Sequence, residues 1–591
     1  MKQTVLVLSA ALLAATGSAQ ITFSGHTPAE FGIESVLSYT RSIFVDYDQD
    51  GHLDFFSNVI YRNDGTGHFT RLDSTLITGY EQVDWADFDN DGYPDLLTNL
   101  RMGGTPEDSN YIFIYRNEGP PNWTLRNVSD SLGLGYNYPI YNCDLVDPAW
   151  FDYDGDGWLD FYISSYEYPI MGQSNPDHLF HNHGGRYFTE VSDSSLVDWH
   201  WRCSRGVSLL DYDEDCDVDV FVSAYRLQAN LLLQNNGDGT FWDVAPQKGV
   251  DGLLIGGYYG HNIGAAIADY NNDGHMDIFT PITHHEGYPG DTTGHLWISN
   301  GPPDWEYTCH FEGSGLINTE IGSNPSYADF DNDGDVDLFY INLYYEPDTT
   351  GWLFRNEGDC RFTDVTDSVG LQVHKGKYYG LWCDVNEDGF LDIVWARDDS
   401  FPVYTCTEFM MNSGGNGNHW LQVDVASPDR NRSAIGTRLD AWAGELQVTR
   451  EVLHNEGHHY GSTFIPRQHF GLGSHTLIDS LVIRWPDGNR DVMQDVGVDT
   501  ILRIVKAPGI AEKPGSRIET GRLEIRTNGY EVEVRLGNRN ATVIDAAGRV
   551  RGHLRPDAEG LARWQAGSGG VYFVVVQRGT EQQAAKAVLI R

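Results

Sequence analysis

The chain has 591 residues, with 39 Lys or Arg against 85 Asp or Glu, a formal net charge of −46 at pH 7. This acidic balance excludes a nucleic-acid partner as a working hypothesis, because phosphate binding needs basic surface, and it favours cations as ligands. The length predicts about two to four domains, and 13% aromatic residues with 65 glycines indicate an all-β chain with many turns rather than a disordered one.

The N-terminus predicts a secretory signal peptide over residues 1–19. Lys2 supplies a positive charge, an apolar run follows from Val5 to Ala15, and small residues precede a cleavage point after Ala19. A membrane anchor is the alternative, but the apolar run is far shorter than the roughly 20 residues that span a bilayer. No later segment has the composition of a membrane span, so we expect an exported chain that is free or attached to the cell surface.

A nine-residue acidic motif occurs seven times along the first two thirds of the chain. Its copies begin at Asp46, Asp87, Asp152, Asp211, Asp269, Asp329 and Asp384. Each copy precedes an apolar β-rich run and then a hairpin signal such as YRNDGTGHFT, which starts at Tyr61. Repeated β units of roughly 55–60 residues match four-stranded propeller blades better than solenoid coils. We therefore predict an all-β chain with a seven-bladed β-propeller over residues 20–415.

The segment 21–33 is similar to residues 362–371, which end the last complete hairpin. We expect this N-terminal strand to complete the final blade, because closing the ring removes exposed sheet edges.

The acidic motif has the ligand pattern of a calcium loop. Carboxylates or amides stand at positions 1, 3 and 5, a glycine permits positive φ at position 6, position 7 offers a carbonyl, and an Asp stands at position 9. A solvated acidic turn is the alternative for one copy, but seven copies in register argue against it. Magnesium demands stricter geometry than calcium. The fourth copy departs from the pattern, because Cys216 replaces the glycine and a β-carbon there strains positive φ.

These repeats resemble the FG-GAP/VCBS repeats of integrin α-type β-propellers. The resemblance implies about seven structural Ca²⁺ ions, held at positions 1, 3, 5 and 9 by side chains and at position 7 by the backbone. The implied ligands are Asp46, Asp48, Asp50, His52, Asp54, Asp87, Asp89, Asp91, Tyr93, Asp95, Asp152, Asp154, Asp156, Trp158, Asp160, Asp211, Asp213, Asp215, Asp217, Asp219, Asp269, Asn271, Asp273, His275, Asp277, Asp329, Asp331, Asp333, Asp335, Asp337, Asp384, Asn386, Asp388, Phe390 and Asp392.

Residues 418–507 contain no acidic loop and read as short strands joined by tight turns, a small β-sandwich-like domain. The segments NHWLQVDV, NRSAIG, HFGLG and RWPDG resemble the ASPIC/UnbV domain. The matching residues are Asn418, His419, Trp420, Asn431, Arg432, Ile435, Gly436, Phe470, Gly471, Leu472, Gly473, Trp485, Pro486 and Gly488.

Several histidines of this domain raise the alternative of a metal site. They are His454, His458, His459 and His469. No Glu is placed as in a zincin, and Gly457 and Gly461 favour a loop, so we expect turn or surface histidines; the same holds for His284 and His285.

A Pro- and Gly-bearing linker over residues 508–521 leads to a last β unit at 522–591. This unit resembles the C-terminal β-sandwich sorting domain of type IX secretion cargo, although Ala547 stands where that family commonly has a bulkier or polar residue. The matching residues are Val543, Asp545, Gly548, Arg549, Gly570, Tyr572, Phe573 and Val574. The resemblance implies recognition by bacterial secretion machinery and a place outside the cell. A small β-sandwich of unrelated role is the alternative.

Three functions are compatible with these features. The first is an extracellular binding, adhesion or scaffold protein that recognises a glycan or protein, with loops on a rigid scaffold carrying recognition. Aromatic runs at 166–171, 198–202 and 256–262 suit sugar stacking, although blade packing is the favoured interpretation of any single ring. The second is a secreted polysaccharide lyase or hydrolase, for which no catalytic residues are predicted, because no nucleophile motif is visible. The third is adhesion through a calcium ion shared with a partner.

Overall fold

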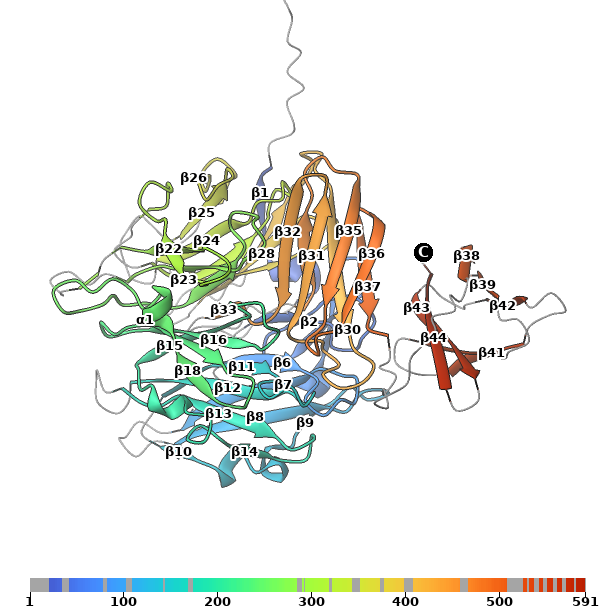
Figure 1. Cartoon of the computed structure of the whole chain (residues 1–591), viewed down its shortest axis with the longest axis horizontal. Helices are drawn as coiled ribbons and strands as arrows, with labels where there is room; N and C mark the ends of the chain where they lie inside the picture. Colours follow the sequence, from blue (N-terminus) through green and yellow to red (C-terminus); the bar gives the residue numbers. More distant parts are fainter. Residues whose placement is uncertain are drawn as a thin grey trace, which may run out of the picture.

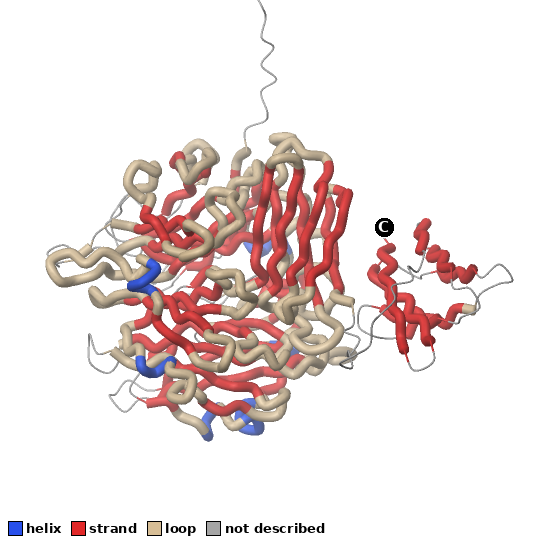
Figure 2. The backbone as a smooth tube through the Cα atoms, in the orientation of Figure 1, coloured by secondary structure: helices blue, strands red, loops and turns tan. Residues whose placement is uncertain are grey.

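The computed structural model describes residues 21–33, 42–77, 82–102, 109–141, 144–167, 174–283, 290–291, 293–317, 322–342, 351–371, 377–397, 408–457 and 466–507, and strand segments between 525 and 589. Strands dominate these residues, and the helices are short turns (Figure 2). The helices are η1 (Pro28–Phe31), η2 (Asp73–Thr75), η3 (Ser129–Leu132), η4 (Gly135–Asn137), η5 (Val197–Trp199) and α1 (Ala245–Lys248). No described helix is both long and apolar enough to cross a bilayer. The predicted signal segment and the linker lie outside the described residues.

The described strands up to residue 412 form seven antiparallel sheets, numbered here in chain order (Figure 1). Sheet 1 holds β2 (Ile43–Val45), β3 (Asp54–Phe56), β4 (Ile60–Asn63) and β5 (Phe69–Leu72). Sheet 2 holds β6 (Val83–Ala86), β7 (Asp95–Met102), β8 (Ser109–Asn117), β9 (Leu125–Asn127) and β10 (Ile140–Tyr141). Sheet 3 holds β11 (Asp144–Phe151), β12 (Asp160–Tyr166), β13 (His178–Asn182) and β14 (Phe188–Glu190).

The remaining four sheets follow the same order. Sheet 4 holds β15 (Ser204–Leu210), β16 (Asp219–Ala224), β17 (Leu231–Asn235) and β18 (Phe241–Asp243). Sheet 5 holds β19 (Ala265–Ala268), β20 (Asp277–Thr280), β21 (His295–Ser299), β22 (Tyr307–Cys309) and the distant β33 (Glu456–Gly457). Sheet 6 holds β23 (Gly322–Ala328), β24 (Asp337–Asn342), β25 (Gly351–Asn356) and β26 (Phe362–Asp364). Sheet 7 holds β27 (Lys377–Cys383), β28 (Asp392–Arg397), β29 (Glu408–Asn412) and β1 (Phe23–His26).

Aromatic side chains pack each sheet against the next, and the last sheet also packs against the first. The ring pairs, in order from sheets 1 and 2 to sheets 7 and 1, are Phe56–Trp85, Phe88–Trp150, Phe151–Phe241, Phe221–Trp297, Phe279–Tyr340, Phe339–Trp382 and Phe55–Phe409. Most of these rings are fully buried. Strands that are apolar on both faces therefore lie between neighbouring sheets, and burial of large aromatic surfaces supplies much of the stabilisation.

The predicted pairing of the N-terminal strand with the last sheet is confirmed. β1 runs antiparallel to β29, with Phe23 opposite Asn412 and His26 opposite Phe409. The first and last strands of this region thus share one sheet, which joins the two ends of the series.

Residues 420–505 form two further sheets that face a common core. One contains β30 (Trp420–Ala426), β34 (Gln468–Gly471) and β37 (Thr500–Val505). The other contains β31 (Thr437–Ala443), β32 (Leu446–Val452), β35 (Leu477–Arg484) and β36 (Arg490–Gly497). Side chains such as Leu439, Phe470 and Trp485 fill the space between them. This part is β-sandwich-like, as predicted.

The C-terminal region is also built from antiparallel strands. One sheet contains β38 (Ile525–Asn528), β39 (Glu531–Arg535) and β42 (Leu561–Gln565). The other contains β40 (Ala541–Asp545), β41 (Val550–Leu554), β43 (Gly570–Arg578) and β44 (Glu581–Leu589).

Candidate metal centres

The seven acidic loops share one backbone conformation. Each connects the first and second strands of its sheet. Position 4 has φ between 55° and 69°, and position 6 has φ between 76° and 102°, in every loop. Glycine occupies position 6 in six of them, and Cys216 holds the same conformation in the fourth, with φ 76°. The sequence pattern therefore specifies a repeated structure, and the fourth copy keeps it despite the strain of a β-carbon.

In each loop, carboxylate side chains accept hydrogen bonds from backbone amides of the same loop. In all seven loops Oδ2 of the first Asp accepts a hydrogen bond from the amide of position 6, at 2.7–3.2 Å. Oδ1 of the fifth-position Asp accepts one from the amide of position 7, at 2.8–3.1 Å. These bonds fix one oxygen of each carboxylate.

The ninth-position Asp ties the loop to the rest of its sheet. Its Oδ2 accepts from the amide of position 2 at 2.9–3.3 Å, and its Oδ1 accepts from an amide at the end of the third strand at 2.7–2.8 Å. All seven of these residues are at most 1% exposed. Their primary role in the fold is thus to link three strands, and any cation would use remaining lone pairs.

The carboxylate oxygens without a hydrogen-bond partner have the chemistry and the spacing of calcium ligands. Buried carboxylate oxygens without a hydrogen-bond partner among the described residues include Oδ1 of Asp46, Asp48, Asp89, Asp152, Asp213 and Asp331, all at positions 1 or 3. In loops 1 to 4, three carboxylates each place an oxygen within 4.8 Å of the others. Two ligands of one Ca²⁺ ion lie up to about 5 Å apart, because each Ca–O distance is roughly 2.3–2.6 Å. The donor set is all oxygen and suits calcium.

Burial perturbs these carboxyls strongly. Desolvation raises the pKa of the first-position residues Asp46, Asp87, Asp152, Asp211, Asp269 and Asp384 to about 7. The pKa of Asp329 is also raised well above its usual range, by desolvation and then by the charges of its neighbours Asp333 and Asp331. A buried carboxylate without a counter-charge is costly, so a divalent cation would offset that cost at neutral pH.

The loops differ in the residue that precedes the hairpin turn. Arg62 contacts Oδ2 of Asp48 at 2.5 Å and of Asp50 at 3.3 Å. Arg116 contacts the equivalent oxygens of Asp89 and Asp91 at 2.9 and 3.0 Å. These arginines neutralise Oδ2 atoms of loops 1 and 2, and they leave Oδ1 of Asp48 and Oδ1 of Asp89 for a cation. The sequence analysis missed them, although the repeated YRN segments carried the signal.

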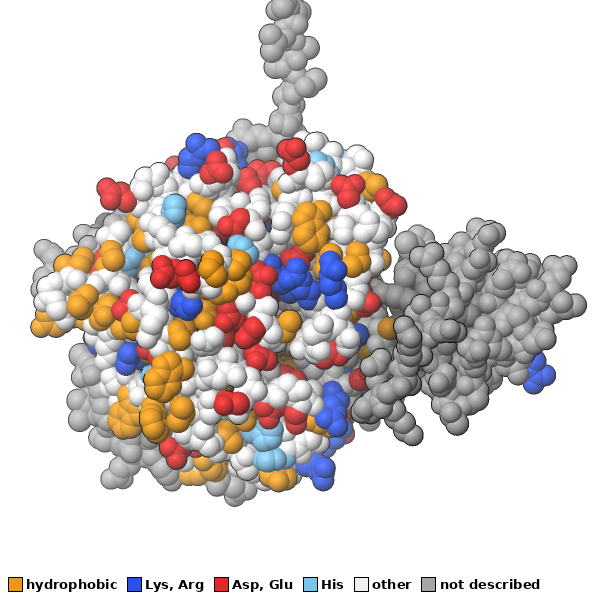
Figure 3. Space-filling view, in the orientation of Figure 1, with side chains coloured by type: hydrophobic (Ala, Val, Ile, Leu, Met, Phe, Trp, Pro, Cys, Tyr) orange, Lys and Arg blue, Asp and Glu red, His pale blue; other side chains and the backbone are white. Residues whose placement is uncertain are grey.

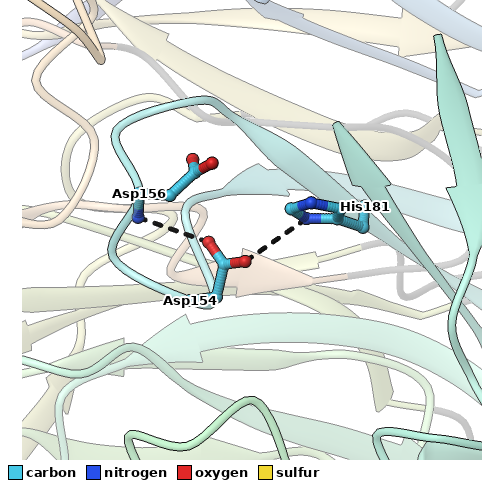
Figure 4. A group of neighbouring side chains, drawn as sticks. All are labelled: Asp154, Asp156 and His181. Atoms are coloured by element: carbon cyan, nitrogen blue, oxygen red, sulfur yellow. Dashed lines mark hydrogen bonds and ion pairs between the residues drawn. The ribbon is translucent and has the colours of Figure 1, made fainter. Parts of the chain in front are cut away.

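The third loop places a histidine at this position. His181 Nδ1 lies 3.4 Å from Asp154 Oδ2 and 3.2 Å from Asp160 Oδ1. Figure 4 shows Asp154 between the His181 ring and the amide of Asp156, which donates to Oδ1 at 3.3 Å. Hydrogen bonding to Asp160 raises the pKa of His181 against the opposing effect of burial.

A set of hairpin asparagines links neighbouring sheets. In sheets 2, 3, 4, 6 and 7 the side-chain amide donates to the carbonyl of position 2 in the preceding sheet's loop, at 2.8–2.9 Å. These bonds are Asn117 to Tyr47, Asn182 to Phe88, Asn235 to Tyr153, Asn356 to Tyr270 and Asn412 to Phe330. Sheet 5 has Ser299 at this place. Sequence analysis interpreted these residues only as turn formers, because their partners lie about 70–94 residues away.

We call the seven sheets up to residue 412 the first unit and the two sheets of residues 420–505 the second unit. The expectation of surface histidines was wrong for two residues of the second unit. His454 is 1% exposed and His469 is 8% exposed. His469 Nε2 lies 2.6 Å from Oδ1 of Asn332 in the sixth loop. His454 lies 3.8 Å from Asp84 and 3.6 Å from Asp147. Both side chains face the sheets of the first unit, which the local sequence gives no way to anticipate. The other histidines of that prediction lie outside the described residues.

Exposed aromatic side chains gather beside sheet 4. Trp199, Trp201 and Trp242, named here the tryptophan patch, are 64%, 54% and 53% exposed. The amide of Phe241 donates to Ser195 at 2.9 Å, which holds the segment carrying Trp199 beside β18. Figure 3 shows hydrophobic side chains grouped where Figure 1 places β18. These rings are not packed between sheets, unlike the residues in the ring pairs above.

Comparison with known proteins places the two units in recognised families. A model described as an FG-GAP-like repeat matches residues 46–98, 152–222, 211–280 and 329–395, which contain all seven acidic loops. A model described as ASPIC and UnbV matches residues 427–511. The chain therefore carries FG-GAP-like repeats and an ASPIC/UnbV domain.

The chain is similar to cartilage acidic protein 1. It is 26% identical to the human protein over 418 residues, covering 68% of this chain and 59% of the relative. It is 25% identical to the Xenopus tropicalis protein over 421 residues, covering 68% and 60%. The chain thus spans about three fifths of the length of these relatives. A solved Agrocybe aegerita lectin with specific recognition of non-reducing terminal N-acetylglucosamine aligns with 15% identity, 65% coverage of this chain, 97% coverage of the lectin and a TM-score of 0.37.

Proposed function

We propose that this chain is an exported, calcium-stabilised seven-bladed β-propeller that binds an extracellular glycan or protein. The observation that carries the proposal is the set of seven loops with one conformation, five of which hold buried carboxylate oxygens that lack a hydrogen-bond partner among the described residues. The series of sheets joined end to end by β1 and β29 supports the propeller architecture.

The calcium ions have a structural role in this proposal. Each would be held by the residues at positions 1, 3, 5, 7 and 9 of its loop, and it would supply the positive charge that the buried carboxylates lack. Because the unfolded chain does not assemble these sites, calcium affinity adds to the free energy of folding. Calcium removal is therefore expected to destabilise the first unit.

The binding surface is proposed at the tryptophan patch and the connections next to it. Leu254 and Tyr258, which lie in the connection between sheets 4 and 5, are 60% and 46% exposed. Exposed indole rings offer flat faces on which the apolar faces of sugar rings stack, and they lose little conformational entropy on binding. A partner with apolar faces and neutral polar groups fits this surface better than an acidic one, given the net charge of −46.

The route to the cell exterior rests on the two ends of the chain. The predicted signal peptide and the likeness of residues 522–591 to a type IX sorting domain support export followed by recognition at the cell surface. The described C-terminal strands fit the β-sandwich that such a domain requires.

The proposal is tested on the full chain by counting bound calcium and by screening glycans. Native mass spectrometry should find about seven ions, and chelation should lower the melting temperature strongly. On a glycan array, Trp199→Ala and Trp201→Ala should each reduce binding at least about tenfold, whereas Tyr136→Ala, which removes a 57% exposed ring in η4, should not. One ion or none would refute the calcium role. Equal glycan binding by all variants would exclude the tryptophan patch as the binding surface. Glycan cleavage would establish the polysaccharide-active alternative.

A further inference from the structure

The ASPIC/UnbV unit lies on the ends of the sheets that carry the acidic loops. Its residues contact every one of the seven loops. In loop order, the contacts are Arg467 to Gly51, Ser433 to Asp87, Asn431 to Gly157, Arg438 to Glu214, Arg438 to Gly274, Gly473 to Asn332 and Gln422 to Asp384. Most of these bonds engage backbone groups of the loops, so they depend on the loop conformation rather than on exposed side chains.

One segment of this unit, residues 453–457, reaches beyond its own sheets into the middle of the first unit. β33 pairs with β19, so that Gly457 lies opposite Ala265 (Figure 1). The amide of Leu209 donates to His454 at 2.7 Å, and that of Ile267 donates to Asn455 at 3.0 Å. The amide of Tyr327 donates to the Glu456 side chain at 2.7 Å.

These contacts involve the first strands of five consecutive sheets. β6 and β11 supply Asp84 and Asp147 to His454, and β15, β19 and β23 supply the backbone donors. Burial alone would lower the pKa of His454, but the negative charges of Asp147 and Asp84, which lie 3.6 and 3.8 Å from its ring nitrogens, outweigh this effect and raise the pKa to about 10. The imidazole is therefore a buried cation at neutral pH, and it compensates two buried carboxylates of the first unit.

The close approach of two backbones fixes the segment. A β-carbon on Gly457 would lie 2.0 Å from the carbonyl oxygen of Val207, and one on Gly206 would lie 2.7 Å from that of Gly457. We call this contact between segment 453–457 and the first strands the joint. Only glycine fits at either position, because the two backbone segments pack closely together.

We propose that the ASPIC/UnbV unit is a calcium-dependent cap, whose segment 453–457 plugs the axis of the ring and withdraws when the loops lose their ions. The inference rests on the proposed calcium role. Calcium fixes the backbone groups that the cap binds, so ion binding and docking are linked, and the coupling must act equally in both directions. Loss of the ions leaves repelling carboxylates beneath the cap at all seven contacts.

Hydrogen exchange of the full chain distinguishes docking from global folding. The amides of Leu209, Ile267 and Tyr327 report on the joint, because their acceptors belong to the cap. The amide of Val244, which donates to Leu232 within sheet 4 at 2.8 Å, is the internal reference. Chelation should accelerate exchange at the joint at least about tenfold while the reference stays protected, and added calcium should restore protection.

A matched pair of glycine variants tests the reverse direction. Gly457→Ala places a β-carbon against Val207, whereas a β-carbon at Gly497 of the same unit meets nothing within 4 Å. Gly457→Ala should expose the joint amides in calcium and weaken calcium affinity, and Gly497→Ala should do neither. If chelation accelerates exchange of the joint amides and the reference amide equally, the inference is overturned, because undocking of the cap then cannot be separated from global unfolding. If calcium is bound but the joint amides stay protected on chelation, the inference is also overturned, while the proposed function remains intact. Absence of bound ions would refute both.

Discussion

The hairpin asparagines yield a prediction whose magnitude follows from counted bonds. Asn182 is fully buried, and its side-chain amide donates to Phe88 and Leu159, both at 2.9 Å. Its Oδ1 accepts from the amide of Gly185 at 2.8 Å. Serine can replace this last bond, since Ser299 Oγ accepts from Gly301 in sheet 5. Asn182→Ser therefore removes the two donated bonds alone, and we expect a loss of about 2–4 kcal/mol, because each buried carbonyl left without a partner costs roughly 1–3 kcal/mol.

Urea unfolding at saturating calcium measures this loss, with Ser299→Asn as the converse variant. The introduced amide would face the carbonyl of Tyr212 in the preceding loop, so the variant should be neutral or more stable by up to about 1 kcal/mol. A loss below about 0.5 kcal/mol for Asn182→Ser would contradict the reasoning. A Ser299→Asn variant that is destabilised by as much as Asn182→Ser would show that packing, not the inter-sheet bond, decides the effect.

Three further predictions follow from buried charge and backbone strain. In chelator the chain should become more stable as the pH falls from about 7 to 5, because the first-position carboxyls bind protons with a pKa of about 7 in the folded state but only near 4 when unfolded. In calcium the stabilising effect of the ions should shrink over the same pH range. A difference in melting temperature between calcium and chelator that stays constant with pH would contradict this. Cys216→Gly should raise stability by about 1 kcal/mol by relieving φ 76°, measured against Cys216→Ser, which keeps the β-carbon and should change nothing. His454→Gln should cost about 3–5 kcal/mol by leaving Asp84 and Asp147 uncompensated; the additional change Asp147→Asn should recover part of this cost, and no recovery would mean that His454 acts through packing.

The sequence predicted the repeated elements well because their determinants are local. The acidic loop needs its carboxylates, its glycine and its hairpin within one repeat unit, so spacing alone located all seven copies. The strand that completes sheet 7 was also predictable, because residues 21–33 resemble the end of a complete repeat. The second unit's sandwich-like character followed from alternation within short strands.

The contacts between repeats and between units were not predictable in the same way. Asn182 donates to Phe88, 94 residues earlier, and no local pattern distinguishes this role from an ordinary turn. His454 was expected at a surface, because glycines beside a histidine usually mark a loop. Gly457 lies instead in strand β33, where it allows a close approach to the backbone of Val207. In both cases a residue with a familiar local role is used for long-range packing.

The position of the ASPIC/UnbV unit bears on where a partner can bind. Antiparallel strands alternate in direction, so the acidic loops and the hairpins with the asparagines lie at one end of the sheets, and the connections from each sheet to the next lie at the other. The cap covers the first end. Trp199 and Trp201 lie in the connection between sheets 3 and 4, and Leu254 lies in the next one, at the uncovered end. A partner bound there would not compete with the cap, so calcium would influence recognition only through the rigidity of the sheets and not by exposing the tryptophan patch.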